Sequence, residues 1–340
     1  MHTDPQKILL IGKVGKRIGM GHLVRLSSLY DILRPVYETT LLINDDKAGL
    51  EFANRGGIRF NYYKSYTDII KFIKKIGNPA VIIVDILYFP LKDLRVLKNY
   101  CKFLIVFDDL HKLVDKQIEG VIICPQETFK NKIEYKKYTC IVKGADFFPL
   151  KNTYRLYRKR KIFSNSVKHI LISLGGFPAR EDILFLIGNL DDCLDKKIFI
   201  HAVLGYSLFG LNKLFSKRIV IHTKLEDLGA LITKADLGII SAGFVKFEFM
   251  CIGTPFCIVS INSHQKELAK KFSSKGYGIY LGYAKALRAK PKNFCKKINY
   301  LLYANLLRKE MFLRSRKLID GNGDVRLLKF ISDLLERERM

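Results

Sequence analysis

Long apolar stretches are missing from this chain of 340 residues. Its apolar runs are short pieces such as "AVIIVDILYF", residues 80–89, whereas a helix that crosses a bilayer needs roughly 18 consecutive apolar residues. The first residues, "MHTDPQK", also lack the charged and then apolar order of a secretion signal. We therefore expect no membrane span and a cytoplasmic location.

Closely spaced cysteine pairs are also missing. The chain has seven cysteines, none of them in a C-x-x-C pair, and most lie within apolar segments. This pattern is typical of buried free thiols in a reducing compartment, and it argues against disulfides or zinc. His111, His201 and His222 show no metal-binding spacing either, so we expect local roles for them.

Acidic residues are few compared with basic ones. The chain has 59 Lys and Arg against 32 Asp and Glu, a formal net charge of +27. Nucleic acid, an anionic membrane surface or anionic small substrates are all compatible with this balance. The densest runs are "YRLYRKRK", residues 154–161, and "KALRAKPKNFCKK", residues 285–297. We interpret them as solvated faces, with polyanion binding as the alternative. Because no helix-turn-helix or zinc spacing is found, we do not expect a nucleic-acid partner.

Two nucleotide-binding fingerprints are missing as well. The chain has no G-x-x-x-x-G-K-[ST], which excludes a P-loop enzyme, and Val24 stands where the third glycine of G-x-G-x-x-G belongs. Instead, three expected strands are each followed by a glycine turn and a helix start: "GKVGKRIGMGH", "SLGGFPARED" and "ISAGFVKFE". Such turns bind phosphate because backbone N–H groups and the helix dipole favour negative charge.

Short β-branched runs alternate with helical patterns along the chain. This alternation predicts an α/β fold with two Rossmann-like parallel-sheet domains that face each other across a cleft. We place an N-terminal domain at residues 1–150 and a linker at 151–166, where proline, charge and polar residues break the rhythm. Residues 167–340 form a C-terminal domain that ends in helices.

The stretch "IGMGHLVR" combines glycine, histidine and arginine at the start of an expected helix. His22 lies in the first turn, where the helix dipole disfavours the imidazolium. It is either a neutral imidazole that acts as a base or a packed polar histidine. Arg25 shares the helix face of His22. It either holds a substrate carbonyl or phosphate, or pairs with a carboxylate. Gly19 and Gly21 let the backbone come close to a ligand.

The same stretch resembles the G-x-G-H-x-x-R opening of the UDP-2,4-diacetamido-2,4,6-trideoxy-β-L-altropyranose hydrolases of pseudaminic acid biosynthesis. These are grouped with spore-coat polysaccharide biosynthesis proteins of similar sequence. Other pieces resemble the family in the same order: "IIVDILYF", "FDDLHK", "VKGADFFPLKNTY", "ISLGG", "ADLGIISAGFVKFEFMCIGTP", "HQ" and "LIDGNGDVRL". The resemblance covers nearly the whole chain. It implies the glycosyltransferase-B type of fold, shared with the glycosyltransferase that makes the cell-wall lipid II precursor.

The resemblance implies a reaction in which water displaces UDP at the anomeric carbon of the sugar, without a metal or another cofactor. His22 matches the catalytic histidine of the family. Gly243 would present a helix start to the diphosphate, Glu248 would meet the ribose hydroxyls, and Gln265 would contact the sugar. The full set of expected substrate-binding residues is Gly19, Gly21, Arg25, Asp85, Tyr88, Gly175, Gly176, Gly243, Glu248, His264 and Gln265. Asp108, like Asp85, is expected at a strand end.

Three departures from the family pattern fall where the nucleotide sugar is expected. Phe244 and Val245 replace Ser-Thr, His264 replaces Asn, and Phe177 and Pro178 stand in the region of an Asp. These departures leave a nucleotide-sugar binder with impaired catalysis as one alternative to the hydrolase. The shared fold leaves a glycosyltransferase as the other alternative. The sequence indicates no oligomeric state.

Overall fold

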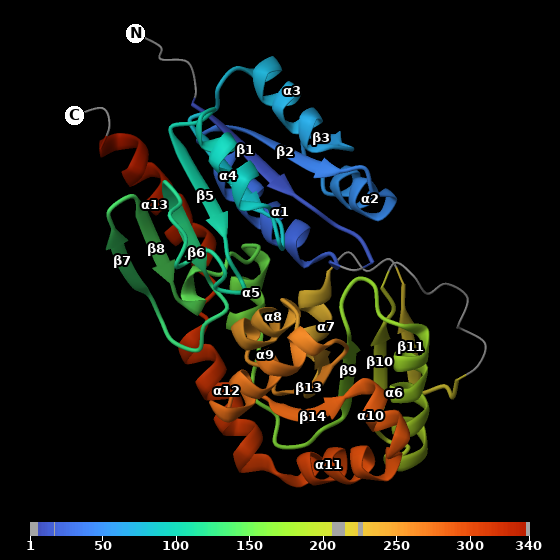
Figure 1. Ribbon diagram of the computed structural model, residues 1–340. Coiled ribbons are helices and arrows are strands. Elements are labelled where there is room, and N and C mark those ends of the chain that lie inside the picture. Colours follow the sequence, from blue (N-terminus) through green and yellow to red (C-terminus); the bar gives the residue numbers. More distant parts are fainter. Residues whose placement is uncertain (1–5, 17, 206–214, 224–226, 338–340) are drawn as a thin grey trace. The chain divides into compact units, whose positions relative to one another are not determined.

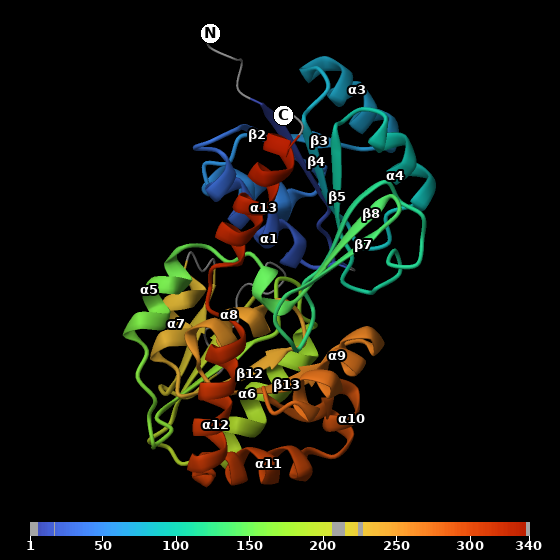
Figure 2. The ribbon, with the colours of Figure 1, turned by 90° about the vertical axis from the view of Figure 1, so that its left-hand side faces the viewer.

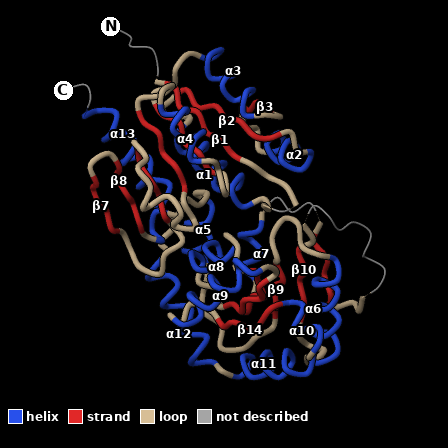
Figure 3. Tube along the Cα trace, in the orientation of Figure 1, coloured by secondary structure: helices blue, strands red, loops and turns tan. Residues whose placement is uncertain are grey.

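The computed structural model describes residues 6–16, 18–205, 215–223 and 227–337. The chain forms two compact units, which are Met1–Asn152 with Gly321–Met340 (unit 1) and Thr153–Asp320 (unit 2). In each unit, strands of a parallel sheet alternate with helices along the chain (Figures 1 and 3). The α/β class with two parallel-sheet domains is therefore confirmed.

Unit 1 contains an eight-stranded sheet in the order β3-β2-β1-β4-β5-β6-β8-β7. Neighbouring strands are parallel, except that β7 pairs antiparallel with β8. The order reverses between β1 and β4, which is where open α/β sheets bind ligands. The strands are β1 (Lys7–Gly12), β2 (Glu38–Asn44), β3 (Phe60–Tyr63), β4 (Val81–Asp85), β5 (Phe103–Phe107), β6 (Gly120–Cys124), β7 (Lys132–Lys136) and β8 (Thr139–Lys143).

Helices cover both faces of this sheet. In Figure 2, α1 and α13 lie on one face and α3 and α4 on the other, so the central strands are buried on both sides. Local signals start some helices: Asp46 caps α2, and Ser65 with Asp68 forms a capping box on α3. The helices are α1 (Gly21–Leu33), α2 (Lys47–Arg55), α3 (Tyr66–Ile76), α4 (Leu91–Lys98) and α13 (Gly323–Arg337), with a 3-10 turn at Ala145–Phe147.

Unit 2 contains a six-stranded, wholly parallel sheet in the order β11-β10-β9-β12-β13-β14, which reverses between β9 and β12. The strands are β9 (His169–Ser173), β10 (Phe199–Val203), β11 (Ile219–His222), β12 (Leu237–Ser241), β13 (Phe256–Ser260) and β14 (Ile279–Tyr283). The helices are α5 (Thr153–Arg160), α6 (Arg180–Cys193), α7 (Leu228–Lys234), α8 (Val245–Ile252), α9 (Ser263–Ser274), α10 (Ala284–Ala289), α11 (Pro291–Tyr303) and α12 (Asn305–Leu318).

The two units differ from the expected domain division in two places. Residues 153–160 form α5, which packs against α7 and α8, where we expect a linker. The last helix, α13, packs against α1 and belongs to unit 1, although we expect it in the C-terminal domain. Its buried residues Leu327, Ile331 and Leu335 explain this, because their apolar stripe is covered in unit 1.

The basic run "YRLYRKRK" is only partly a solvated face. Arg158 donates hydrogen bonds to the carbonyl oxygens of Cys251 and Ile319 at 2.9 Å, and Lys161 donates to Thr233 O at 2.9 Å. These side chains hold α5 to the rest of unit 2, so part of the charge has a structural use.

None of the helices in the described part of the chain combines the length and apolar character needed to cross a membrane.

Candidate active site

The glycine turn after β1 begins the site in unit 1. This turn precedes α1, and Gly19 in it has φ +88°, a conformation that favours glycine. Asn44 at the end of β2 holds this turn, because its side chain accepts from Val14 N at 2.7 Å and donates to Val14 O at 3.0 Å. Helix α1 then starts at Gly21, as expected, and His22 lies in its first turn.

His22 and Asp85 meet at the point where the strand order of the unit 1 sheet reverses, since α1 follows β1 and Asp85 is the last residue of β4. Nδ1 of His22 lies 2.6 Å from Oδ1 of Asp85. Burial raises the pKa of Asp85, but Arg25 and His22 outweigh burial and lower that pKa to about 2. A carboxylate only accepts hydrogen bonds, so Nδ1 of His22 carries a proton, and in the neutral form of the ring the lone pair is on Nε2.

Arg25 is the second partner of Asp85. Its guanidinium donates from Nε to Asp85 Oδ2 at 2.7 Å and from Nη2 to Asp85 Oδ1 at 2.5 Å. It also donates from Nη1 and Nη2 to the two oxygens of Asp109, both at 2.8 Å. The Arg25 side chain is 0% exposed and lies over the ring of Phe107 at 4.3 Å.

Ion pairing with two carboxylates explains how the guanidinium of Arg25 can be buried. Burial disfavours the charged guanidinium, but the carboxylates of Asp109 and Asp85 outweigh it and raise the pKa of Arg25. Of the two roles considered for Arg25, pairing with carboxylates is the one that the structure shows. Contact with a substrate phosphate would require these bonds to break, so Arg25 positions Asp85 and, through it, His22.

The His22, Asp85 and Asp109 side chains also offer potential metal-ligand atoms within 4.8 Å of one another. The donor set fits a metal poorly, because the guanidinium of Arg25 already donates to all four carboxylate oxygens. The arrangement instead has the features of a general base. Asp85 orients the imidazole, and a carboxylate in this position can stabilise an imidazolium.

Asp109 was missed by the sequence reasoning, which named Asp108 at this strand end. Asp108 accepts backbone N–H bonds from Lys112 at 3.1 Å and Leu113 at 2.6 Å, and so shapes the turn after β5. The pair "DD" was visible in the sequence, but which carboxylate turns inward depends on the turn. Tyr88, three residues after Asp85, is 63% exposed with φ +62°.

The reversal point of the unit 2 sheet collects a second group of expected residues. Gly175 and Gly176 follow β9, and Gly243 follows β12, the neighbouring strand. A Cβ on Gly175 would lie 3.9 Å from Ser241 Oγ, and one on Gly243 would lie 3.4 Å from the same atom and 3.9 Å from Gln265 Nε2. The structure therefore brings both glycine turns and Gln265 together.

Helix α8 follows the turn at Gly243 and is buried along its length. Glu248 is 8% exposed and hydrogen-bonds with Tyr154, whose pKa is raised by burial and by this carboxylate. Lys246, which the sequence reasoning did not single out, is fully buried, and its Nζ donates to Gly243 O at 3.1 Å. The letters "FVKFEFM" contained that signal, because a lysine among apolar residues requires partners.

The departures from the family pattern take defined places. Phe244 is the N-cap of α8 and makes no side-chain cap bond, so backbone N–H groups are the donors at this helix start. His264 and Gln265 lie in the first turn of α9, which Asn262 caps by accepting from Gln265 N at 2.9 Å. Pro178 lies in the turn between β9 and α6 and has no N–H to donate.

Comparison with solved structures identifies the type of fold that the two units have. Acinetobacter baumannii MurG has a TM-score of 0.66 at 14% identity over 97% of this chain and 100% of its own. CalG4, the calicheamicin glycosyltransferase, has a TM-score of 0.65 at 14% identity over 98% of this chain and 99% of its own. Anabaena Alr3699/HepE in complex with UDP-glucose has a TM-score of 0.56 at 12% identity over 96% of this chain and 100% of its own. The two units thus have the glycosyltransferase-B type of fold.

A sequence relative narrows the comparison. The chain is similar to the spore coat polysaccharide biosynthesis protein SpsG of Bacillus subtilis strain 168, with 24% identity over 332 residues. The similarity covers 95% of this chain and 97% of SpsG. No protein-family model matches the chain.

Proposed function

We propose that the chain is an enzyme of surface polysaccharide biosynthesis that acts on a nucleotide sugar, with His22 as the general base. The observation that carries this proposal is the His22–Asp85–Arg25 network at the reversal point of the unit 1 sheet. The similarity of the chain to SpsG and the fold it shares with a UDP-glucose complex support the substrate class.

In this proposal His22 Nε2 takes the proton of an oxygen nucleophile, which attacks the anomeric carbon while the nucleoside diphosphate leaves. Such a base contributes about 10²–10⁴-fold in rate. The glycine turns of unit 2 hold the diphosphate through backbone N–H groups at the start of α8. Gln265 and His264 contact the sugar, and Glu248 meets the ribose.

The nucleophile in our first proposal is water, which makes the chain a UDP-sugar hydrolase. The substrate is then a UDP-linked 2,4-diacetamido-trideoxy sugar, as the resemblance of "IGMGHLVR" and the later pieces implies. UDP is a good leaving group, so one base and the N–H donors of unit 2 supply the catalytic groups.

A glycosyltransferase is the second candidate. Its support is the fold shared with the calicheamicin glycosyltransferase, and a base at position 22 activates an acceptor hydroxyl as readily as water. In that case Asp85 and Arg25 keep the same roles, and the nucleophile alone differs.

The test is release of UDP from candidate UDP-sugars, with and without added acceptors. A hydrolase releases UDP at the same rate in both conditions, whereas a transferase depends on the acceptor. His22→Ala should lower kcat by about 10²–10⁴-fold. His22→Ala with the wild-type rate would remove this histidine from the mechanism. Thermal-shift measurements with UDP, CMP and GDP test nucleotide binding independently of turnover.

A further inference from the structure

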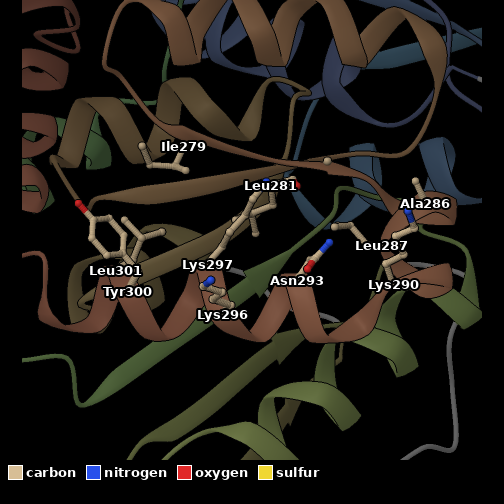
Figure 4. A pocket seen from close by; sticks show the side chains of 11 residues that line it. Ile279, Leu281, Ala286, Leu287, Lys290, Asn293, Lys296, Lys297, Tyr300 and Leu301 are labelled. Carbon is tan, nitrogen blue, oxygen red and sulfur yellow. Dashed lines mark hydrogen bonds between the residues drawn. The ribbon is translucent and has the colours of Figure 1, made fainter.

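A surface pocket of about 640 Å³ lies in unit 2, between β14, α10 and α11. Figure 4 shows apolar side chains of β14 and α10 along it, including Ile279, Leu281 and Leu287. Lys290, at the start of α11, and Lys296, within it, line the same pocket. The pocket therefore combines an apolar floor with ammonium groups.

The outer face of α11 continues this combination. Asn293, Lys296, Lys297 and Tyr300 line the pocket at the i, i+3, i+4, i+7 spacing of one helix face. Tyr300 is 66% exposed, and Tyr303 and Leu306, which follow it, are 85% and 79% exposed. Exposed aromatic and apolar side chains beside lysines mark interaction surfaces.

The stretch of sequence that forms this face carries charge of one sign. The 42 residues between Glu267 and Glu310 contain nine lysines, two arginines and no Asp or Glu. The two arginines have internal partners, because Arg288 is ion-paired with Asp182 and Arg308 donates to backbone carbonyl oxygens. The exposed lysines, among them Lys285, Lys290, Lys292 and Lys296, supply the surface charge.

We propose that this face of unit 2, the α10–α11 surface, binds the anionic surface of a phospholipid bilayer. The lysine ammonium groups pair with lipid phosphates, while Tyr300, Tyr303 and Leu306 enter the headgroup region. The apolar floor of the pocket takes up lipid carbon atoms. A purely phosphate-binding surface would not use exposed leucine or an apolar floor, so the observations favour lipid over nucleic acid. This binding goes beyond the proposed function and does not depend on it.

Vesicle co-sedimentation of the full chain tests the proposal. The wild type should sediment with vesicles of equimolar phosphatidylcholine and phosphatidylglycerol but not with phosphatidylcholine alone, and less so at high salt. The double variant Lys290→Glu/Lys296→Glu should bind about tenfold more weakly or worse. The matched control is Lys74→Glu/Lys75→Glu on α3 of unit 1, where both lysines are exposed. Both variants have a net charge of +23, since 27 − 4 = 23.

A second variant separates lipid from other polyanions. Tyr300→Ser/Tyr303→Ser keeps every charge and changes only exposed side chains, so it should fold normally and bind the anionic vesicles more weakly. Equal loss of binding in the two lysine variants would overturn the proposal, because vesicle binding would then depend on net charge and not on the position of the lysines. Full vesicle binding by the tyrosine variant, with duplex DNA binding that the α11 lysines control, would also overturn it in favour of a polyanion surface.

Discussion

At the scale of single residues, Asp85 fixes a proton on Nδ1 of His22. Its Oδ1 accepts hydrogen bonds from His22 and Arg25, and its Oδ2 accepts one from Arg25. With a pKa of about 2, Asp85 stays charged throughout the neutral range and keeps the proton on Nδ1. In the proposed mechanism the ring is therefore oriented before substrate arrives, which is a form of preorganisation.

The substitution Asp85→Asn tests this role. The amide that replaces the carboxylate can present N–H toward Nδ1 of His22 and favours the other tautomer, and Arg25 loses one ionic partner. We expect Asp85→Asn to lower kcat by about 10²–10⁴-fold with a smaller change in KM. Steady-state UDP release measures both constants.

The control for this variant is Asp108→Asn. Asp108 lies beside Asp109 but caps a turn: one carboxylate oxygen accepts from Lys112 N and the other from Leu113 N, so the single amide oxygen of Asn still accepts one of these two N–H groups. Its kcat should stay close to that of the wild type. An Asp85→Asn enzyme as fast as the Asp108→Asn enzyme would contradict the role of Asp85.

At the scale of elements, three neighbouring strands of unit 2 carry a hydrogen-bonded row of histidines. His169 on β9 lies 3.1 Å from His201 on β10, and His201 lies 3.1 Å from His222 on β11, measured between Nδ1 and Nε2. Burial, together with His222 and Lys234, lowers the pKa of His201 to about 4. The pKa values of His169 and His222 are also lowered, chiefly by burial.

This row predicts loss of stability in mild acid. The histidines are neutral when folded, whereas in the unfolded chain they take up protons near pH 6.5, so protonation favours unfolding as the pH falls from 6.5 toward 4. Lys234, Lys168 and Lys161 strengthen the effect and Asp236 opposes it. Each histidine can add at most about 1.4 kcal/mol per pH unit to the slope of the unfolding free energy.

Urea unfolding at several pH values between about 7.5 and 4.5 measures this slope. His201→Gln should flatten it. Identical slopes for the wild type and His201→Gln would exclude the histidine row as the cause.

Strong local patterns made some elements predictable. The glycine turn and the apolar period placed the start of α1 correctly, and continuous apolar runs such as "VIIVD" marked the buried strands. Residues 153–160 are expected in a linker because half of them are charged, and the helix that they form, α5, depends on tertiary contacts of Tyr154 and Arg158. The strand β7 is exposed and lysine-rich, as edge strands often are, and carries little apolar signal.

The candidate site was predictable as a set of residues but not as a network. The resemblance supplied His22, Arg25 and Asp85, yet their mutual hydrogen bonds follow from the neighbouring positions of β1 and β4 in the sheet. Asp109 and Lys246 were missed because the direction of a buried side chain depends on the turn or helix that carries it. Strand order and side-chain direction are properties of the folded chain, and single-sequence patterns do not report them.

At the scale of the whole molecule, unit 1 is built from two separate segments of the chain. Unit 1 needs α13, which follows unit 2 in sequence, and this helix buries Leu327, Ile331 and Leu335. Tyr37 and Ser332 also join it to the rest of unit 1 through a hydroxyl–hydroxyl bond of 2.8 Å.

Removing residues 321–340 should therefore destabilise unit 1 selectively. Burial of three Leu or Ile side chains contributes about 5–9 kcal/mol, which is comparable to the whole stability of a typical domain. Hydrogen exchange should show lost protection in β1 and β4 and retained protection in β9 and β12. Truncation after Arg337, where α13 ends, is the control and should leave both patterns intact. Unchanged protection of β1 in the longer deletion would show that α13 is dispensable.

The late position of α13 also matters during translation. When Asp320 has left the ribosome, every residue of unit 2 has been synthesised. The first 152 residues then still lack the segment that covers α1. Unit 2 can thus finish folding before unit 1, against the usual order in which the part made first folds first. Until synthesis ends, the apolar side of α1 stays open to chaperones, so nascent chains stalled near Asp320 should be their preferred clients.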